Sequence, residues 1–130
     1  IFICFDCVMK ILLAGEDRLH VSVLRTLMSD MKVQCDVAPT RSAFARMAAT
    51  GAYGIIVSLF VEPFLDGSDL AHTIPERSIG SPAIFVLSWS QCESCVMSLY
   101  ESGVDQFFSL PCDMNRFRGR LARYLNRFGP

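Results

Sequence analysis

Hydrophobic positions along the chain alternate between short unbroken runs and runs spaced three or four residues apart. Unbroken runs are typical of strands covered on both faces, and spaced runs are typical of amphipathic helices. The strand-like runs are residues 10–14, 33–37, 54–59, 83–88 and 104–110. A helix-like run follows each of them. The pattern therefore predicts five β-strands that alternate with five helices.

Capping residues mark where several helical runs begin. Glu16 and Asp17 precede the first helix, where they complement the positive end of the helix dipole. Thr40 is predicted to cap the second helix, and Asp113 is predicted to cap the last one. The apolar face of the first helix is formed by residues at helical spacing, namely Leu19, Val23, Leu24, Leu27, Met28 and Met31.

The third and fourth helices have less regular signals. The third follows Asp66 and Gly67 and is truncated or kinked by Pro75. The fourth spans about residues 91–102 and is predicted to turn four side chains inward, namely Cys92, Cys95, Val96 and Leu99. Short parallel strands joined by helices need right-handed crossovers, so the expected architecture is a three-layer α/β sandwich.

Composition is that of an ordinary globular protein. The chain has 130 residues, of which 52% are hydrophobic and 19% charged, and this suits one domain with a single core. A net charge of -1 lacks the basic excess of a dedicated nucleic-acid binder. No apolar run approaches the roughly 20 residues of a membrane span. We interpret residues 9–130 as the domain and residues 1–8 as an extension from cloning or upstream translation, or as an extra edge strand.

Six cysteines raise the question of disulfides or metal binding. Cys4 with Cys7 and Cys92 with Cys95 have the spacing of zinc ligands, but 84 residues separate the two pairs. The pairs are expected at opposite ends of the sheet, so the four sulfurs should not converge. Because the aliphatic core makes disulfides unnecessary, a reducing cytoplasm is predicted. The cysteines are interpreted as core or incidental thiols, and His20 and His72 as surface histidines.

The order of these motifs resembles the receiver domain of two-component response regulators. The resemblance extends from Met9 to about Phe128 and rests on KILLAGED, YGIIVS followed by VEPFLDG, PAIFVLS, and ESGVDQFFSLP. It implies a flavodoxin-like (βα)5 three-layer sandwich with a five-stranded parallel sheet in the order 2-1-3-4-5. It also implies a bacterial, cytoplasmic protein of phosphorelay signal transduction that is not an enzyme.

The positions that carry the family's chemistry are largely replaced in this sequence. The acidic pair of the family falls on Gly15 and Glu16, and its phosphoacceptor aspartate falls on Leu59. The family's Ser or Thr after the fourth strand falls on Ser88, and its lysine on the fifth strand falls on Leu110. An alkyl side chain has no lone pair with which to accept a phosphoryl group. The resemblance therefore predicts a pseudo-receiver that acts without phosphorylation of residue 59.

The same replacements bear on metal binding. Mg²⁺ prefers carboxylate oxygens in a near-octahedral array, and here Glu16 remains, helped at most by Asp17. Magnesium binding is therefore predicted to be weak or absent, and no other cofactor is expected. The two acids are better explained by the helix dipole, whereas a remnant switch residue and an ordinary strand-end hydroxyl explain Ser88 equally well.

In the family, the hydroxyl after the fourth strand couples to an aromatic residue on the fifth strand. Ser88 and Phe107 fill these positions, and Phe107 is predicted to stay buried because an apolar ring has little reason to leave a core. Signals leave through the face formed by the fourth helix, the fifth strand and the fifth helix. A protein partner or a homodimer is expected there, whereas nucleic acid and membrane are not. An output domain, such as a DNA-binding module, is expected if the natural chain continues beyond Pro130.

Basic residues of the last helix are the candidate partner face, although an ordinary solvated surface explains them as well. These residues are Arg116, Arg120, Arg123 and Arg127.

Two other functions stay open. A working receiver would use a neighbouring acid, Glu62 or Asp66, as its acceptor. A flavodoxin-type nucleotide or flavin binder is the other, although the loop AGEDR is acidic and lacks the Ser, Thr and Gly donors that hold a phosphate.

Overall fold

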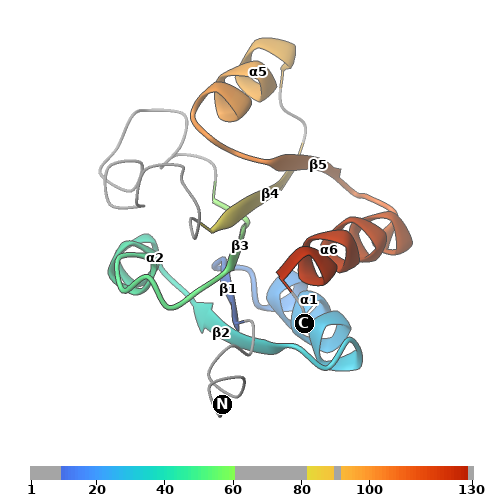
Figure 1. Cartoon of the computed structure of the whole chain (residues 1–130). Coiled ribbons are helices and arrows are strands. Elements are labelled where there is room, and N and C mark those ends of the chain that lie inside the picture. The colour runs from blue at the N-terminus through green and yellow to red at the C-terminus, as the bar shows by residue number, and fades with distance from the viewer. Residues whose placement is uncertain (1–9, 61–81, 90–91, 129–130) are drawn as a thin grey trace.

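The computed structural model of the chain describes residues 10–60, 82–89 and 92–128. The strands of this part are β1 (Lys10–Ala14), β2 (Gln34–Ala38), β3 (Ile55–Ser58), β4 (Ala83–Trp89) and β5 (Gln106–Leu110). The helices of this part are α1 (Arg18–Asp30), α2 (Arg41–Ala48), α5 (Glu93–Glu101) and α6 (Met114–Phe128). Strands and helices alternate as the hydrophobic pattern predicts (Figure 1), except that the connection between β3 and β4 falls in residues outside the described part.

All five strands are parallel and form one sheet in the order β2-β1-β3-β4-β5. Helices α1 and α6 cover one face of the sheet, and α2 and α5 cover the other (Figure 1). A sheet covered on both faces buries consecutive residues of its strands, and Ile55, Ile56 and Val57 of β3 are at most 1% exposed. The three-layer, flavodoxin-like fold expected from the sequence is confirmed.

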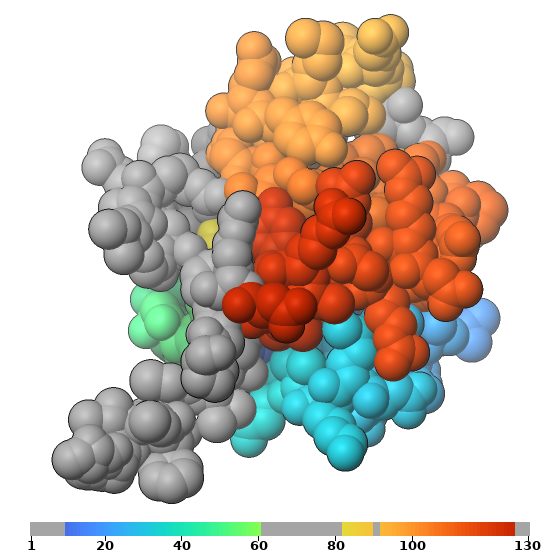
Figure 2. All heavy atoms as spheres, turned by 45° about the vertical axis from the view of Figure 1, so that its right-hand side comes forward, coloured from blue at the N-terminus to red at the C-terminus, as the bar shows by residue number. Residues whose placement is uncertain are grey.

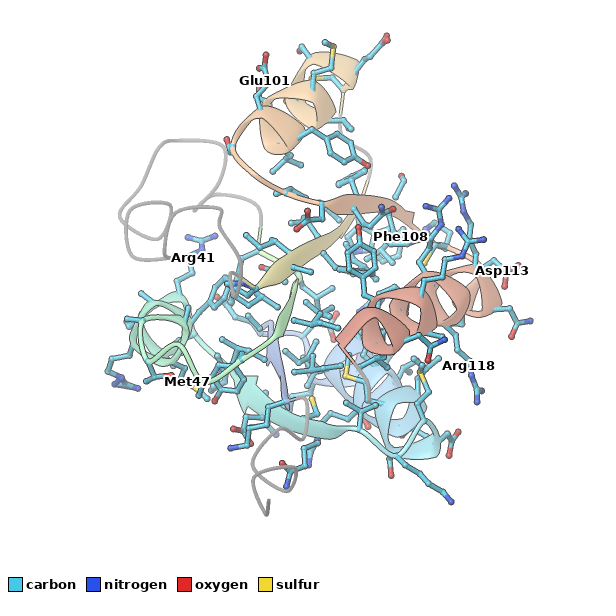
Figure 3. All side chains as sticks on the ribbon, viewed as in Figure 1. Arg41, Met47, Glu101, Phe108, Asp113 and Arg118 are labelled. Carbon is cyan, nitrogen blue, oxygen red and sulfur yellow. The ribbon has the colours of Figure 1, made fainter. Side chains whose placement is uncertain are left out.

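Aromatic rings fix the helices to both faces of the sheet. Successive side chains of a strand point to opposite faces. On the α1 and α6 side, the ring centroid of Phe85 lies 6.1 Å from that of Phe108 and 6.0 Å from that of Phe117. Figure 3 shows Phe108 between β5 and α6. On the opposite side, Phe44 of α2 stacks on Phe60, which follows β3, at 6.2 Å.

The predicted capping residues cap their helices. The Asp17 carboxylate accepts hydrogen bonds from two N–H groups in the first turn of α1, at 2.9 and 3.4 Å. Thr40 Oγ1 accepts from the N–H of Ala43 at 3.1 Å, and Asp113 Oδ1 accepts from the N–H of Asn115 at 2.9 Å. These bonds satisfy N–H groups that lack a partner inside the helix, and they fix where loops from the sheet enter the helices.

Several details differ from the sequence prediction. Strand β3 is one residue shorter than predicted at each end, so Leu59 follows the strand. Strand β2 lies one residue later than predicted, β5 begins two residues later, and β4 ends one residue later. Leu19 and Val23, expected on the packed face of α1, are 70% and 47% exposed. Cys92 is also exposed rather than turned inward, because it is the cap of α5 and precedes its first turn. Among its predicted inward neighbours, Cys95 and Val96 are half-buried and Leu99 is buried.

The third predicted helix, together with His72 and Pro75, falls in residues 61–81, outside the described part of the chain. The extension over residues 1–8 lies outside it as well. Among the helices that the structure describes, none has the length and apolar character that a membrane crossing would require.

Candidate functional site

Residues from several strands meet at the carboxyl edge of the sheet, where open α/β folds place their working side chains. Glu16 follows β1, Leu59 follows β3, and Ser88 and Leu110 lie at the ends of β4 and β5. All four line one hollow of about 270 Å³. The structure therefore brings together the positions that the resemblance aligns with a phosphorylation site.

Gly15 and Leu59 approach each other so closely that a side chain at residue 15 would collide with the leucine. A Cβ added to Gly15 would lie 2.6 Å from Cδ1 and 3.2 Å from Cβ of Leu59. Carbon atoms in favourable contact stay about 3.5–4.0 Å apart. The backbone holds the pair in place, since the N–H of Leu59 donates to the carbonyl of Ala14 at 2.8 Å. The leucine fills the space where the side chain of an acid would begin.

Leu59 and Leu110 extend the apolar core on the α1 and α6 side up to the carboxyl edge. Both are half-buried and pack against the cluster that contains Leu87. Beside them lies a second hollow of about 180 Å³, which the exposed residues Leu19 and Val23 of α1 also line. Hydrocarbon walls offer no oxygen ligand to a divalent cation and no nucleophile to a phosphoryl group.

Two polar residues that line the larger hollow, Asp17 and His20, are paired with each other. Besides capping α1, Asp17 places Oδ2 2.7 Å from Nδ1 of His20. The hydrogen bond from His20 is the main cause that holds the pKa of Asp17 below its ordinary value. The His20 ring in turn meets Trp89 edge-on at a centroid distance of 5.5 Å. Asp17 is thus held by the helix and the imidazole, which supports its interpretation as a capping residue.

The residues present fit a magnesium ion poorly. Over residues 10–60, 82–89 and 92–128, no three His, Cys, Asp or Glu side chains converge in the way that a metal ion requires. Glu16 is exposed at the hollow, and the neighbouring Asp17 already accepts hydrogen bonds from α1 and His20. The alternative acceptors Glu62 and Asp66 lie outside the described residues.

Two residues of the site were not found from the sequence. Buried Ser58 donates through Oγ to the carbonyl of Phe60 at 2.8 Å and accepts from its N–H at 2.9 Å, which fixes the turn that carries Leu59. Arg41 projects from the start of α2 (Figure 3) and lies over the Phe60 ring at 5.5 Å. In the sequence, Ser58 reads as a strand residue and Arg41 as part of a helix, so only their three-dimensional contacts reveal these roles.

The two residues aligned with the family's switch lie on the same face of the sheet. Val86 pairs with Phe107 and Ser88 pairs with Ser109, so Ser88 is diagonal to Phe107. Ser88 Oγ donates to the carbonyl of Trp89 at 3.2 Å. Phe107 packs against the core on the α2 and α5 side and is half-buried. It lies near the sheet edge, where β5 has a neighbouring strand on one side.

The arginines of the candidate partner face differ in exposure. Arg116 and Arg123 are exposed, whereas Arg120 is half-buried and donates to Oε1 of Gln106 at 3.4 Å. The side chain of Arg127 lies outside the described residues. Figure 2 shows α6 forming a broad surface between α5 and α1. Arg116 and Arg123 are therefore the members of this set best placed to meet a partner.

No sequence profile of a protein family matches the chain, and no curated protein does. The structure, however, is similar to solved receiver domains. The signal receiver domain of a response regulator from Bermanella marisrubri is 19% identical, with a TM-score of 0.73 over 90% of this chain and 98% of that one.

Two further structures show how far the likeness extends. The receiver domain of a sensor histidine kinase from Pseudomonas aeruginosa, with a magnesium ion coordinated in its active-site cleft, is 19% identical with a TM-score of 0.68 over 92% of this chain and 96% of that one. A candidate pilus assembly-related protein from Burkholderia pseudomallei is 15% identical, with a TM-score of 0.72 over 95% and 93%. At such identities the likeness concerns the fold alone, and the chain has the fold of a receiver domain.

Proposed function

We propose that this chain is a pseudo-receiver, a signalling domain of the two-component type that acts through protein contacts without phosphorylation of residue 59. The observation that carries the proposal is the contact between Gly15 and Leu59. Because Cδ1 of Leu59 lies 2.6 Å from the place of a Cβ on residue 15, the two replacements compensate each other. The absence of a side chain at Gly15 makes room for Leu59, which stands in the place of the family's acceptor aspartate.

The third replacement supports the same proposal. Leu110 packs against the same apolar cluster as Leu59. A charged group in these surroundings would lose hydration without gaining a partner, so an isolated lysine or aspartate would be unfavourable there. The three positions together maintain the carboxyl edge by packing. In this proposal the domain has no enzymatic activity and no resident cofactor.

Intact-protein mass spectrometry after incubation with phosphoramidate and Mg²⁺ tests the absence of phosphorylation. We expect the mass of the chain to stay unchanged, while a working receiver domain in the same tube gains one phosphoryl group. A phosphoryl adduct on this chain that hydroxylamine removes, as it does an acyl phosphate, would overturn the proposal. Glu16→Gln, Glu62→Gln and Asp66→Asn would then identify which neighbouring acid had accepted the group.

The contact surface is proposed to be the face formed by α5, β5 and α6. Sedimentation velocity at rising protein concentration, with and without phosphoramidate, measures self-association through it. Reversing the charge of exposed Arg116 and Arg123 to Glu is expected to weaken the dimer, and the phosphodonor is expected to leave it unchanged. Arg18→Glu with Arg25→Glu on α1 is the matched control, because both residues are exposed on another helix. Equal loss in both double variants would exclude this face as the specific contact.

A further inference from the structure

The cysteine pair at the start of α5 has a geometry that its sequence spacing alone does not reveal. Cys92 is the N-cap residue of α5, and Cys95 lies in the first turn. Their Sγ atoms are 2.9 Å apart. A disulfide bond is about 2.05 Å long, so the sulfurs need to approach by only about 0.9 Å to become bonded. Because Cys92 is exposed and Cys95 half-buried, a small reagent in solution can reach the first sulfur.

Two polar groups contact the sulfur of Cys92. Cys92 Sγ lies within hydrogen-bond distance of Cys95 Sγ, and Oγ of Ser94 lies 3.3 Å away. Hydrogen bonds from the Cys95 thiol, the Ser94 hydroxyl and the Cys95 N–H lower the pKa of the Cys92 thiol to about 7. The same contact raises the pKa of Cys95. The N-terminus of a helix also stabilises a thiolate, whereas the negative charge of the adjacent Glu93 carboxylate disfavours one.

Two other described cysteines are in different surroundings. Cys35 and Cys112 pack half-buried against the core on the α1 and α6 side. Burial raises the pKa of Cys35 to about 11 and also raises the pKa of Cys112. Thiols of this kind stay protonated and are poor nucleophiles near neutral pH. They behave as the core thiols that the sequence predicts, while the pair on α5 does not.

We propose that Cys92 and Cys95 form a redox-active dithiol that is oxidised to an intramolecular disulfide by low-molecular-weight disulfides. The dithiol exchanges electrons reversibly with the disulfide and thiol forms of a small molecule such as glutathione. The site lies apart from the hollow at Leu59, and the inference does not depend on the proposed signalling function. Cys92 is the attacking residue, since its sulfur is the more exposed and accepts the hydrogen bonds described above.

The reaction proceeds through two thiol–disulfide exchanges. The Cys92 thiolate attacks one sulfur of the small disulfide, forms a mixed disulfide and expels one thiolate. That thiolate takes a proton and leaves as a thiol. The Cys95 thiol then loses its proton, attacks Sγ of Cys92 and expels the second thiolate, which is protonated in turn. The protein gives up two electrons and two protons, and one small disulfide becomes two thiols.

The test equilibrates the full chain in glutathione buffers of increasing oxidised fraction at pH 7, followed by acid quenching and alkylation with N-ethylmaleimide. Glutamyl endopeptidase cuts after Glu93 and separates the two cysteines into fragments 77–93 and 94–101, each with one cysteine. A Cys92–Cys95 disulfide keeps these fragments joined until dithiothreitol is added. We expect joined fragments at oxidised fractions that leave Cys112 fully alkylated.

A matched pair of variants separates the two roles. Cys95→Ser retains a hydrogen-bond donor beside Cys92 but removes the second sulfur, so it should accumulate a glutathione adduct on residue 92. Cys92→Ser should show neither adduct nor joined fragments. The wild-type result decides the matter by itself if a variant fails to fold. Full alkylation of Cys92 and Cys95 at every glutathione ratio, or oxidation of Cys112 at the same ratio, would overturn the proposal.

Discussion

The hollow at the carboxyl edge of the sheet and the first turn of α5 differ in chemistry. At the hollow, the fold gathers side chains from several strands, and the ends of β3 and β5 contribute the hydrocarbon groups of Leu59 and Leu110. On α5, a spacing of three residues places two sulfurs 2.9 Å apart on an accessible turn. The edge where open α/β folds place their working side chains thus presents alkyl groups, and two closely spaced thiols lie at the start of a helix.

Different forces maintain the two regions. Gly15 and Leu59 are held by close packing, whose energy depends on volume and is insensitive to pH. The thiols of Cys92 and Cys95 are held by hydrogen bonds to an ionisable sulfur, whose strength changes with protonation. Substitutions at the first region should alter stability, and substitutions at the second should alter reactivity.

Gly15→Asp is expected to have the largest effect. Its Cβ would lie 2.6 Å from Cδ1 of Leu59, and the carboxylate would be placed against hydrocarbon. We expect a loss of about 3 kcal/mol in the free energy of unfolding, at the upper end of overpacking effects, measured by urea denaturation. Adding Leu59→Ala should recover part of this loss. A Gly15→Asp protein as stable as the wild type would contradict the packing account.

Leu59→Ala should reduce the free energy of unfolding by about 2 kcal/mol, somewhat less than at a fully buried leucine, because the side chain is half-buried. Leu19→Ala is the matched control, since this leucine is 70% exposed. It should change stability by less than about 0.5 kcal/mol. Urea denaturation of both variants measures the difference, and equal losses would mean that Leu59 contributes no more packing than a surface residue.

Alkylation of Cys92 should depend on pH with a midpoint near the pKa of about 7. Below this pH the thiolate is protonated and the rate falls, and above it the rate reaches a plateau. At pH 7 we expect Cys92 to react roughly ten times faster than Cys112, because the gain in thiolate exceeds the loss in intrinsic nucleophilicity. Iodoacetamide labelling followed by peptide mass spectrometry gives both rates. A midpoint shared by the two cysteines would contradict the assignment.

Ser94→Ala should have the smallest effect. Its hydroxyl is the second donor to Cys92, after the Cys95 thiol, so its removal should raise the pKa of Cys92 less than Cys95→Ala does. The stability of the fold should stay unchanged, because Ser94 is exposed. The same alkylation profile measures both shifts. A larger shift in Ser94→Ala than in Cys95→Ala would reverse the proposed order of donors.

Much of the fold could be predicted because strands covered on both faces need unbroken apolar runs, such as Ile55 to Val57. The gathering of Leu59, Ser88 and Leu110 could be predicted too, since the carboxyl ends of parallel strands meet at one edge. The exposure of Leu19 could not be predicted. Its position in the helical period places it on the apolar face of α1, but the side chain lines a hollow where a packed neighbour was expected.

The exact start of a helix and contacts between separate segments could not be predicted from the sequence either. The position of Cys92 differed from prediction because a helical period cannot tell the cap residue from the first turn, and one residue changes the direction of the side chain. Ser58 and Arg41 act through the residue Phe60, which neither spacing nor composition connects to them.

Ser58 has a consequence for which side chains residue 59 can carry. Its hydroxyl holds the backbone on either side of residue 59 without involving the side chain of that residue. A scaffold that secures its own turn in this way tolerates the exchange of the side chain presented there. The turn therefore sets no demand on side chain 59, and the limit on its size comes from the space that Gly15 leaves beside it.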